Sequence, residues 1–539
     1  MNAFATLLRE RIRRDRWQLL MWIVGTALLA YLTYVGVTQS YGTQQDREAL
    51  LATAIANPVI MLFRGLPSGA DEGAFMLFLI FPFLAIDAAF MSSFLAVRHT
   101  RMDEELGRTE LVAATPAGRT VPVLATVAHG LLANLGLALL TSLALLSTGL
   151  AAGGSFVAGF GAGAVGVTFL GIGLIAGQLM RTSRGANALA VWILLLTFLL
   201  AGLGNALGTP TADLQRIESS WLTWLSPFGW GEQSRPFADD ALWPLVLCVV
   251  FGLALAAASV AIQSTRDFGA SLVPERRGRP DASASLAGPT GLVWRLTRGS
   301  ILGWAAGGLL TGLLATSLAG VLADVVTELP SVQAILEVIS ANGSIAQGAV
   351  IIFFEMLGIL AACAAVQTVC RARSEEAHGT AEAVLATPVD RVRWLSGYVV
   401  VGFAAIVIVV ASAVVGAALG IAGRDGDWSL MGDVAVVGSG QVVAASVFLV
   451  LTALVFVLAP RVTIPLGWTL VMLAMVLGLF GPLFGFPDWL VHAAPIAAAP
   501  TVNGDGVDLQ GLWGLLVAIA VIGGATAALM RRRELAPAG

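Results

Sequence analysis

The stretch VAGFGAGAVGVTFLGIGLIAGQLM, residues 157–180, contains 24 consecutive residues without a charged side chain. About 20 helical residues cross the hydrocarbon layer of a bilayer, which is about 30 Å thick. The stretch is therefore long and apolar enough to span a membrane as a helix. Its many Gly and Ala residues favour close contact with neighbouring helices, because small side chains let helix backbones approach one another.

The whole chain has the same character as this stretch. It has 539 residues, of which 57% are hydrophobic and only 12% are charged, and its mean hydropathy is +0.85. An ordinary soluble protein carries about 25% charged residues, so the composition excludes that class and predicts an all-α polytopic membrane protein. Apolar runs of sufficient length predict twelve transmembrane helices. They lie near residues 17–38, 74–97, 121–150, 157–180, 187–205, 241–262, 300–322, 348–369, 395–422, 433–459, 465–484 and 510–530.

The basic residues predict the orientation of these helices. All 30 are Arg, and with a cytoplasmic N-terminus 25 of them fall in inner segments and 5 in outer segments. Positive charge gathers on the cytoplasmic side of membrane proteins, so we expect a multi-pass protein of the cell membrane with both termini in the cytoplasm. A Walker A loop needs a Lys on the ATP phosphates and this chain has no Lys, so we expect that it is not a P-loop ATPase and that it is a non-catalytic membrane subunit.

The N-terminal stretch fits two interpretations, and the His and Cys residues indicate no metal site or disulfide. Residues 4–17 combine apolar side chains with five arginines, which is typical of an amphipathic helix on the inner surface or of a simple flanking anchor of the first span. The four histidines are far apart in the sequence and the three cysteines lie in or beside apolar runs. We therefore predict neither a metal centre nor a disulfide framework.

An internal repeat predicts the domain organisation. The loop after the second span, RMDEELGRTELVAATPAGR (101–119), aligns with RSEEAHGTAEAVLATPVDR (373–391), after the eighth span, with 9 of 19 positions identical. Trp221, Leu222 and Pro227 also recur as a second set near residues 489–495. We expect two parallel six-helix halves, residues 1–262 and 292–539, joined by a polar cytoplasmic linker at 263–291 and related by an axis along the membrane normal.

The repeated loop suits the docking of a cytosolic partner. Its acidic residues favour a short helix, because the helix dipole attracts them near its start, and Thr-Pro then ends the helix. Exposed charges on such a rod would fit a groove on a partner, and two loops would need a partner with two equivalent sites. The alternative is an ordinary surface loop. The predicted coupling residues are Glu104, Gly107, Glu110, Thr115, Pro116, Arg119, Glu376, Gly379, Glu382, Thr387, Pro388 and Arg391.

The loop motif E-E-x-G-x-x-E-x-x-x-A-T-P-x-x-R, the basic N-terminal stretch and the six-plus-six span pattern resemble the permease subunit of ABC-2 type exporters. The most similar group is the fused-half actinobacterial polyketide-antibiotic exporters of the tetronasin-resistance type. The second loop departs from the motif at Ala377 and His378. The resemblance implies an ABCG-like fold whose loops couple to two copies of a separately encoded ATP-binding subunit, which binds ATP and Mg²⁺. It also implies that segments 206–235 and 485–505 dip back into the membrane from outside.

Two carboxylates lie within predicted spans, Asp87 in the second and Glu355 in the eighth. A carboxylate at this depth costs at least about 2.5 kcal/mol, so such residues face the protein interior. They could line a shared cavity that favours the cationic or polar head of an otherwise apolar substrate. They could instead join helices through polar groups such as His129, Asn134 or Gln178. The predicted substrate pathway comprises Asp87, Glu355, Phe83, Phe90, Phe354, Trp192 and Trp468, and the predicted outer gate comprises Trp221, Pro227, Trp489 and Pro495.

These features favour the permease of an ATP-driven multidrug exporter. The resemblance implies apolar drug-like or polyketide antibiotics as substrates, and nothing indicates nucleic acid. The alternative is a proton-coupled secondary transporter that uses Asp87 or Glu355, although such a carrier has no need for two matched docking loops. A membrane-embedded enzyme would require clustered His, Asp or Cys residues, which are not apparent in the sequence.

Overall fold

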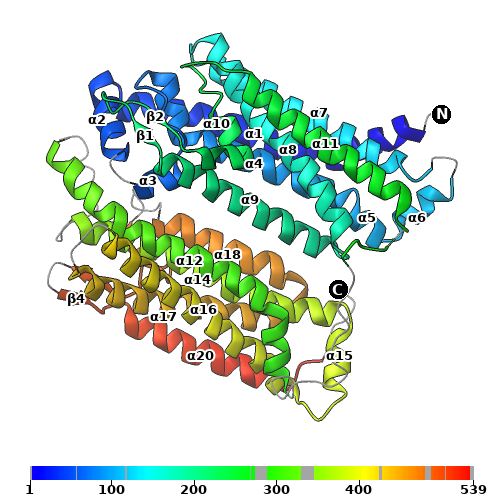
Figure 1. The fold of residues 1–539 in the computed structure, drawn as a ribbon. Coiled ribbons are helices and arrows are strands. Elements are labelled where there is room, and N and C mark those ends of the chain that lie inside the picture. Colours follow the sequence, from blue (N-terminus) through cyan, green and yellow to red (C-terminus); the bar gives the residue numbers. More distant parts are fainter. Residues whose placement is uncertain are drawn as a thin grey trace. The chain divides into compact units, whose positions relative to one another are not determined.

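Long helices dominate the chain in the computed structural model (Figure 1). The structure describes residues 3–55, 58–115, 118–267, 269–273, 288–328, 345–423, 428–479, 487–503 and 506–534. Within these residues, 12 helices are long and apolar enough to cross a membrane. The prediction of an all-α polytopic membrane protein is confirmed.

The chain forms two compact units, Met1–Arg277 and Gly278–Gly539. Residues 274–287 of the predicted linker lie outside the described residues. The six long helices of the first unit are α1 (Ala3–Ser40), α4 (Glu72–Arg98), α7 (Val121–Leu146), α8 (Ala152–Leu179), α9 (Ser183–Ala206) and α11 (Trp243–Thr265). Its short elements are α2 (Gln44–Ile55), α3 (Pro58–Phe63), α5 (Arg101–Glu105), α6 (Arg108–Ala113), β1 (Thr209–Pro210), β2 (Ile217–Glu218), the 3₁₀ helix η1 (Trp221–Leu225) and α10 (Pro227–Glu232).

The second unit is built in a similar way. Its six long helices are α12 (Pro289–Glu328), α14 (Ile345–Ala377), α16 (Arg391–Ala422), α17 (Leu430–Leu458), α18 (Thr463–Leu479) and α20 (Leu512–Met530). Its short elements are α15 (Thr380–Leu385), η3 (Pro460–Val462), α19 (Asp488–Val491), β3 (Thr501–Asn503) and β4 (Gly506–Asp508). The strands β1 and β2, and likewise β3 and β4, pair antiparallel as small ribbons.

The same pairs of helices pack together within each unit. In the first unit α1 packs on α7, α4 on α8, and α8 on α11; in the second unit α12 packs on α16, α14 on α17, and α17 on α20. Counted along each unit, the first long helix contacts the third, the second contacts the fourth, and the fourth contacts the sixth. Each unit has its own core of buried aliphatic and aromatic side chains.

The basic N-terminal stretch is part of the first long helix. Helix α1 runs for 38 residues without a break, which corresponds to about 57 Å at a rise of 1.5 Å per residue. It is therefore about twice as long as the hydrocarbon layer is thick. The stretch is an extension of the first spanning helix and not a separate interfacial helix, and its Arg11 and Asp15 side chains are buried in the unit.

Glycine allows α8 and α11 to touch backbone to backbone. A Cβ atom added to Gly171 would lie 2.5 Å from the carbonyl oxygen of Gly252, and one added to Gly252 would lie 2.5 Å from that of Val167. Both distances are shorter than any real contact of a Cβ atom, so only glycine fits without moving the helices apart. The predicted close contact through small residues is confirmed.

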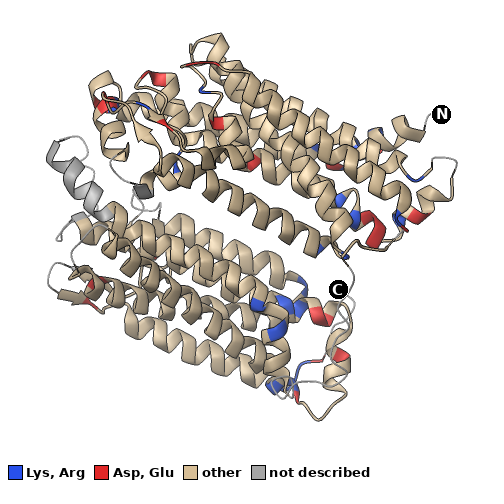
Figure 2. Ribbon diagram, in the orientation of Figure 1, with Lys and Arg blue, Asp and Glu red and all other residues tan. Residues whose placement is uncertain are grey.

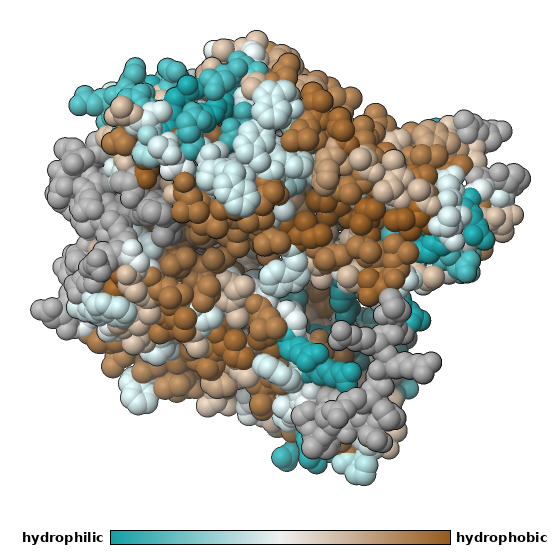
Figure 3. Space-filling model, viewed as in Figure 1, coloured by the Kyte–Doolittle hydropathy of each residue, from teal (hydrophilic) through white to brown (hydrophobic). Residues whose placement is uncertain are grey.

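The surface of each unit is hydrophobic along the long helices and charged at the helix ends. Large hydrophobic side chains such as Met21 and Val521 are exposed on the long helices, and Figure 3 shows broad hydrophobic areas along them. Charged residues gather at the helix ends, with arginines around α5 and α6 in the first unit and around α15 in the second (Figure 2). This division suits helices that are surrounded by lipid and end in water.

Candidate functional site

Both copies of the repeated loop bend at a glycine. Gly107 separates α5 from α6 with a φ of 68°, and Gly379 separates α14 from α15 with a φ of 74°. Residues with a Cβ atom rarely adopt this left-handed conformation, which explains why glycine recurs here. The prediction that each loop forms a single short rigid rod is therefore wrong, because a glycine in the left-handed conformation separates two helical segments in each loop.

The second segment of each loop presents charge to the solvent. Glu110 on α6 and Glu382 on α15 are exposed, as the docking hypothesis requires. Both segments end in the same way, because Thr115 and Thr387 donate a hydrogen bond to the carbonyl oxygen three residues earlier, each at 2.6 Å. Pro388 is exposed after this turn, whereas Pro116 lies outside the described residues.

Glu104 in the first loop is buried. Its carboxylate lies 2.5 Å from a guanidinium nitrogen of Arg266 and 2.8 Å from one of Arg101, and only 5% of its side chain is exposed. Arg266 directly follows α11, the last long helix of the first unit. Arg101 also donates to the carbonyl oxygen of Gly177 near the end of α8, at 2.8 Å.

Glu376 in the second loop has equivalent partners. It accepts hydrogen bonds from Arg533 at 2.7 and 2.8 Å, and only 1% of its side chain is exposed. Arg373 lies 3.9 Å away, and the guanidinium of Arg533 also lies 4.4 Å from the centre of the Phe456 ring. Glu104 and Glu376 therefore do not belong to the exposed charges that the docking hypothesis requires. We call the pairs Glu104–Arg266 and Glu376–Arg533 the loop clamps, because each ties a loop to the end of the last long helix of its unit.

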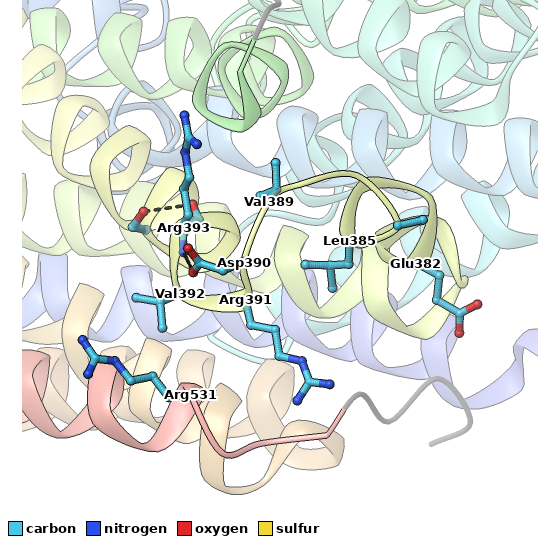
Figure 4. Close-up of a pocket in the computed structure, with 10 residues that line it drawn as sticks. Glu382, Leu385, Val389, Asp390, Arg391, Val392, Arg393 and Arg531 are labelled. Atoms are coloured by element: carbon cyan, nitrogen blue, oxygen red, sulfur yellow. Dashed lines mark hydrogen bonds between the residues drawn. The ribbon is translucent and has the colours of Figure 1, made fainter.

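A cavity adjoins each loop. The larger, of about 910 Å³, lies in the second unit and opens beside α15, the start of α16 and the end of α20. Figure 4 shows Glu382, Arg391 and Arg531 around it, one from each of these places. Arg391 also donates a hydrogen bond to the backbone carbonyl of Arg533. A cavity of about 410 Å³ in the first unit lies between α1 and the α5–α6 loop.

Arg119, the remaining predicted coupling residue, is exposed just before α7. It corresponds in the alignment to Arg391, which is half-buried at the start of α16. The two loops therefore share their glycine turn, their clamp and their exposed glutamate but differ at this last arginine.

The intramembrane acids have different surroundings. The Asp87 carboxylate accepts a hydrogen bond of 3.4 Å from the Thr26 hydroxyl on α1, whereas Glu355 forms no hydrogen bond or ion pair with any residue that the structure describes. The polar groups suggested as partners of these acids bond elsewhere. His129 contacts Asp15, Asn134 contacts Ser92, and Gln178 contacts Gln263. The predicted cavity shared by the two acids stays a prediction.

The aromatic residues of the predicted pathway are divided between core and surface. Phe354 is buried, Phe90 packs against Phe94 with ring centres 5.4 Å apart, and Trp468 packs against the core of the second unit. Phe83 and Trp192 are exposed on the first unit. Their place in the substrate pathway stays a prediction.

The segment between α9 and α11 contains a buried carboxyl that the sequence interpretation missed. Pro227 begins α10, whose N-terminus is capped by the Ser226 hydroxyl, and Glu232 lies at its last position. Asn205 donates a hydrogen bond of 2.7 Å to Glu232, and burial raises the pKa of Glu232 to about 8. Glu232 is a single acidic residue in a stretch that reads as an ordinary loop, so nothing in the sequence indicates that its carboxyl is buried.

The tryptophans of the predicted outer gate lie at the surface of their units. Trp221 and Trp489 are 70% and 72% exposed. The two prolines differ in their surroundings, since Pro227 is buried and Pro495 is partly exposed. Exposed tryptophans between spanning helices suit the interface between lipid and water.

The histidines contradict a second expectation. His99 and His129 lie next to each other and both contact Asp15, so the prediction that no cluster of metal-ligating residues forms is wrong. The three residues come from distant positions in the sequence, and no local spacing could have indicated the cluster.

Comparison with known proteins places the chain in a family. A family model described as the C-terminal domain of the multidrug efflux system permease Rv1217c matches residues 286–531. Over 534 residues the chain is 31% identical to the multidrug efflux system permease protein Rv1217c of Mycobacterium tuberculosis, and the match covers 98% of this chain and 94% of that protein. The chain belongs to this family of efflux permeases. The predicted resemblance to multidrug efflux permeases is confirmed at that level.

Proposed function

We propose that this protein is the membrane-spanning subunit of an ATP-driven multidrug exporter of the ABC-2 type, within the tetronasin-resistance group. Its relative is named a multidrug efflux system permease, and the word system suits a permease that works with other subunits. In this proposal a separately encoded subunit binds and hydrolyses ATP with Mg²⁺, and two copies of it dock on the two repeated loops. The chain itself carries no catalytic step.

The observation that carries the proposal is the matched construction of the loops. Each has a left-handed glycine, an exposed glutamate after it, and a buried glutamate clamped to an arginine beyond the last long helix. An ordinary surface loop needs only polarity and a turn. Two loops with the same internal contacts suit a partner with two equivalent docking sites.

The recurring helix contacts support two parallel six-helix repeats with an ABCG-like fold. The first and third, second and fourth, and fourth and sixth long helices pack together in each unit, which agrees with the repeated loop sequences. The cytoplasmic placement of both loops and both termini follows from the distribution of the arginines. The protein would therefore lie in the cell membrane.

The clamps suggest how the loops act on the spans. A carboxylate and a guanidinium that are both buried hold together firmly, because separating them leaves charges away from water. When the docked subunits close on ATP and push on the loops, the clamps would carry the movement to α11 in the first unit and to α20 in the second. Arg101 would also carry it to α8 through Gly177.

Transport itself would use the apolar interior between the spans. Asp87 and Glu355 would favour a polar or cationic group on an otherwise apolar drug-like or polyketide molecule, and Phe83, Phe90, Phe354, Trp192 and Trp468 would supply apolar contacts. Trp221, Pro227, Trp489 and Pro495 would shape the outer exit. Lipid surrounds the spans.

The proposal is tested by transport in vesicles. The chain is reconstituted with the ATP-binding subunit encoded beside it, and uptake of a fluorescent apolar drug into inside-out vesicles is followed with ATP while an ionophore removes any proton gradient. We expect uptake that needs ATP. Uptake that needs a proton gradient and proceeds without the ATP-binding subunit would contradict the proposal.

A further inference from the structure

Three side chains from three helices converge beneath the first loop. Asp15 lies on α1, His99 directly follows α4, and His129 lies on α7. The Nε2 atoms of His99 and His129 lie 2.5 and 3.3 Å from the same oxygen of Asp15, Oδ2. One possible ligand atom from each residue lies within 4.8 Å of the other two, and all three side chains are buried.

These atoms form a donor set that suits zinc. Two imidazole nitrogens and one carboxylate oxygen, with a fourth position left for water, are typical of an open tetrahedral Zn²⁺ site. With bonds of about 2.0–2.2 Å to the ion, ligand atoms in a tetrahedron lie about 3.4 Å apart. The distance from His129 to Asp15 already fits this spacing, and His99 needs to withdraw from Asp15 by somewhat less than 1 Å.

Neighbouring groups orient these ligands. Arg98 lies 3.1 Å from the other Asp15 oxygen, Oδ1, which leaves Oδ2 to face the two imidazoles. The Nδ1 atom of His99 lies 3.8 Å from a carboxylate oxygen of Asp103, and metal-binding histidines commonly direct their second ring nitrogen to a carboxylate. Neither Nδ1 atom has a hydrogen-bond partner among the described residues.

Arg98 pairs with the ligand Asp15 itself, whereas the other nearby arginines are engaged by groups outside the cluster. Arg11 donates to the backbone carbonyls of His99 and Pro122 at 3.2 and 2.5 Å. Arg14 and Arg108 lie 3.5 and 3.1 Å from Asp103. The two carboxylates, Asp15 and Asp103, therefore offset part of the charge that an added cation would meet.

One member of the buried cluster, His99, borders a cavity. His99 and Asp103 line the cavity of about 410 Å³ that lies between α1 and the first loop, together with Thr109 and Val112 of that loop. The cavity is large enough to admit a hydrated ion and to supply a water molecule to its fourth position.

We propose that Asp15, His99 and His129 bind a divalent transition-metal ion, for which Zn²⁺ is the best match. The ion would join α1 to the end of α4 and to α7 directly beneath the first docking loop. The corresponding positions of the second loop alignment lack this set, because Arg371 stands in place of His99 and Val401 in place of His129. The site would therefore distinguish the first unit from the second.

The test uses the full-length chain in detergent, purified with an affinity tag free of histidine and stripped with EDTA. Co²⁺ is titrated as a coloured probe and Zn²⁺ as its competitor. We expect one tight ion per chain with the visible absorption of tetrahedral Co²⁺, displaced by Zn²⁺. His99→Gln and His129→Gln should each weaken binding at least about 100-fold, since even loss of a supporting contact costs 10–100-fold.

His378→Gln is the matched control, because His378 is exposed in the second loop and its replacement should leave binding unchanged. X-ray absorption at the zinc edge of the wild-type protein gives a measurement that does not depend on the folding of a variant, and it should show two imidazole ligands. Absence of a tight ion in the wild-type protein, fewer than two imidazoles, or full binding by the His99→Gln/His129→Gln double variant would overturn the proposal.

Discussion

Arg533, just beyond the last long helix, binds both carboxylate oxygens of Glu376 in the second loop, at 2.7 and 2.8 Å. The first loop has the same relationship, with Arg266 at 2.5 Å from Glu104. The residues in each pair are more than 150 positions apart in the sequence. Each pair therefore joins the loop of its unit to the end of the last long helix of that unit. Removing one residue of a buried ion pair destabilises a protein strongly, because the remaining charge stays buried without a partner.

We predict that Glu376→Ala destabilises the protein by about 3–5 kcal/mol, because Arg533 and Arg373 would stay buried without the carboxylate. Thermal unfolding of the purified chain in detergent measures this loss. Glu382→Ala, at the exposed glutamate six residues later, is the control and should change stability by less than about 0.5 kcal/mol. Equal melting temperatures for the two variants would show that the clamp does not stabilise the unit.

The exposed glutamates should act on the partner instead. Replacing Glu110 and Glu382 together by Arg reverses the charge that each loop presents, so we expect weaker binding of the ATP-binding subunit and normal thermal stability. Pull-down of the co-expressed subunit measures this binding. Undiminished recovery of the subunit with the double variant would count against docking through these side chains.

The turn glycines should not tolerate side chains. Gly379→Val places a branched residue at a φ of 74°, where the strain costs at least about 1–2 kcal/mol. Nothing lies within 4 Å of the added Cβ, so the loss would come from the backbone alone. Gly514→Ala, in α20 with similarly open space, should cause no loss and can add up to about 1 kcal/mol in the same thermal assay, because Ala favours a helix more than Gly does. A neutral Gly379→Val variant would mean that the loop turns differently.

Glu232 should make stability depend on pH. Its folded pKa of about 8 lies above the ordinary value for Glu because of burial, so its contribution is fully present below about pH 4 and is lost as the pH rises to about 8. The measurement is thermal unfolding between pH 6 and 9. Glu232→Gln stays neutral and should flatten the dependence in this range, whereas Glu218→Gln, at an exposed carboxylate, should leave it as in the wild type. Parallel curves for Glu232→Gln and the wild type would contradict the assignment.

The intramembrane acids provide a test of the transport pathway. Asp87→Asn and Glu355→Gln keep the shape of each side chain and remove its charge, so we expect altered preference among cationic and neutral apolar drugs with normal assembly. Vesicle uptake of a matched pair of such drugs measures the preference. Unchanged preference in both variants would favour a role in helix packing.

The positions of the spans could be predicted from the sequence because lipid imposes a minimum length and a high hydropathy on each of them. The recurrence of Gly107 and Gly379 was also visible, although their left-handed φ, and hence the bend in each loop, was not. The continuity of α1 was missed because an arginine-rich stretch before an apolar run is typical of both an interfacial helix and a long span.

The buried contacts could not be predicted, because their partners are brought together only by folding. Nothing near Glu104 in the sequence indicates Arg266, and nothing near Asp15 indicates His99 and His129. An acidic residue in a polar loop is ordinarily exposed, so the burial of both clamp glutamates runs against the usual expectation. Pairs of this kind follow from helix packing and not from local sequence.

The composition of the complex tests most directly whether two ATP-binding subunits dock on the two loops. The tagged chain is co-expressed with its neighbouring genes, purified in mild detergent and weighed by native mass spectrometry. We expect two copies of a Walker-containing ATPase per chain. We expect both copies to be lost when Glu110 and Glu382 are replaced by Arg. A chain that purifies alone and transports drugs on a proton gradient would contradict this docking.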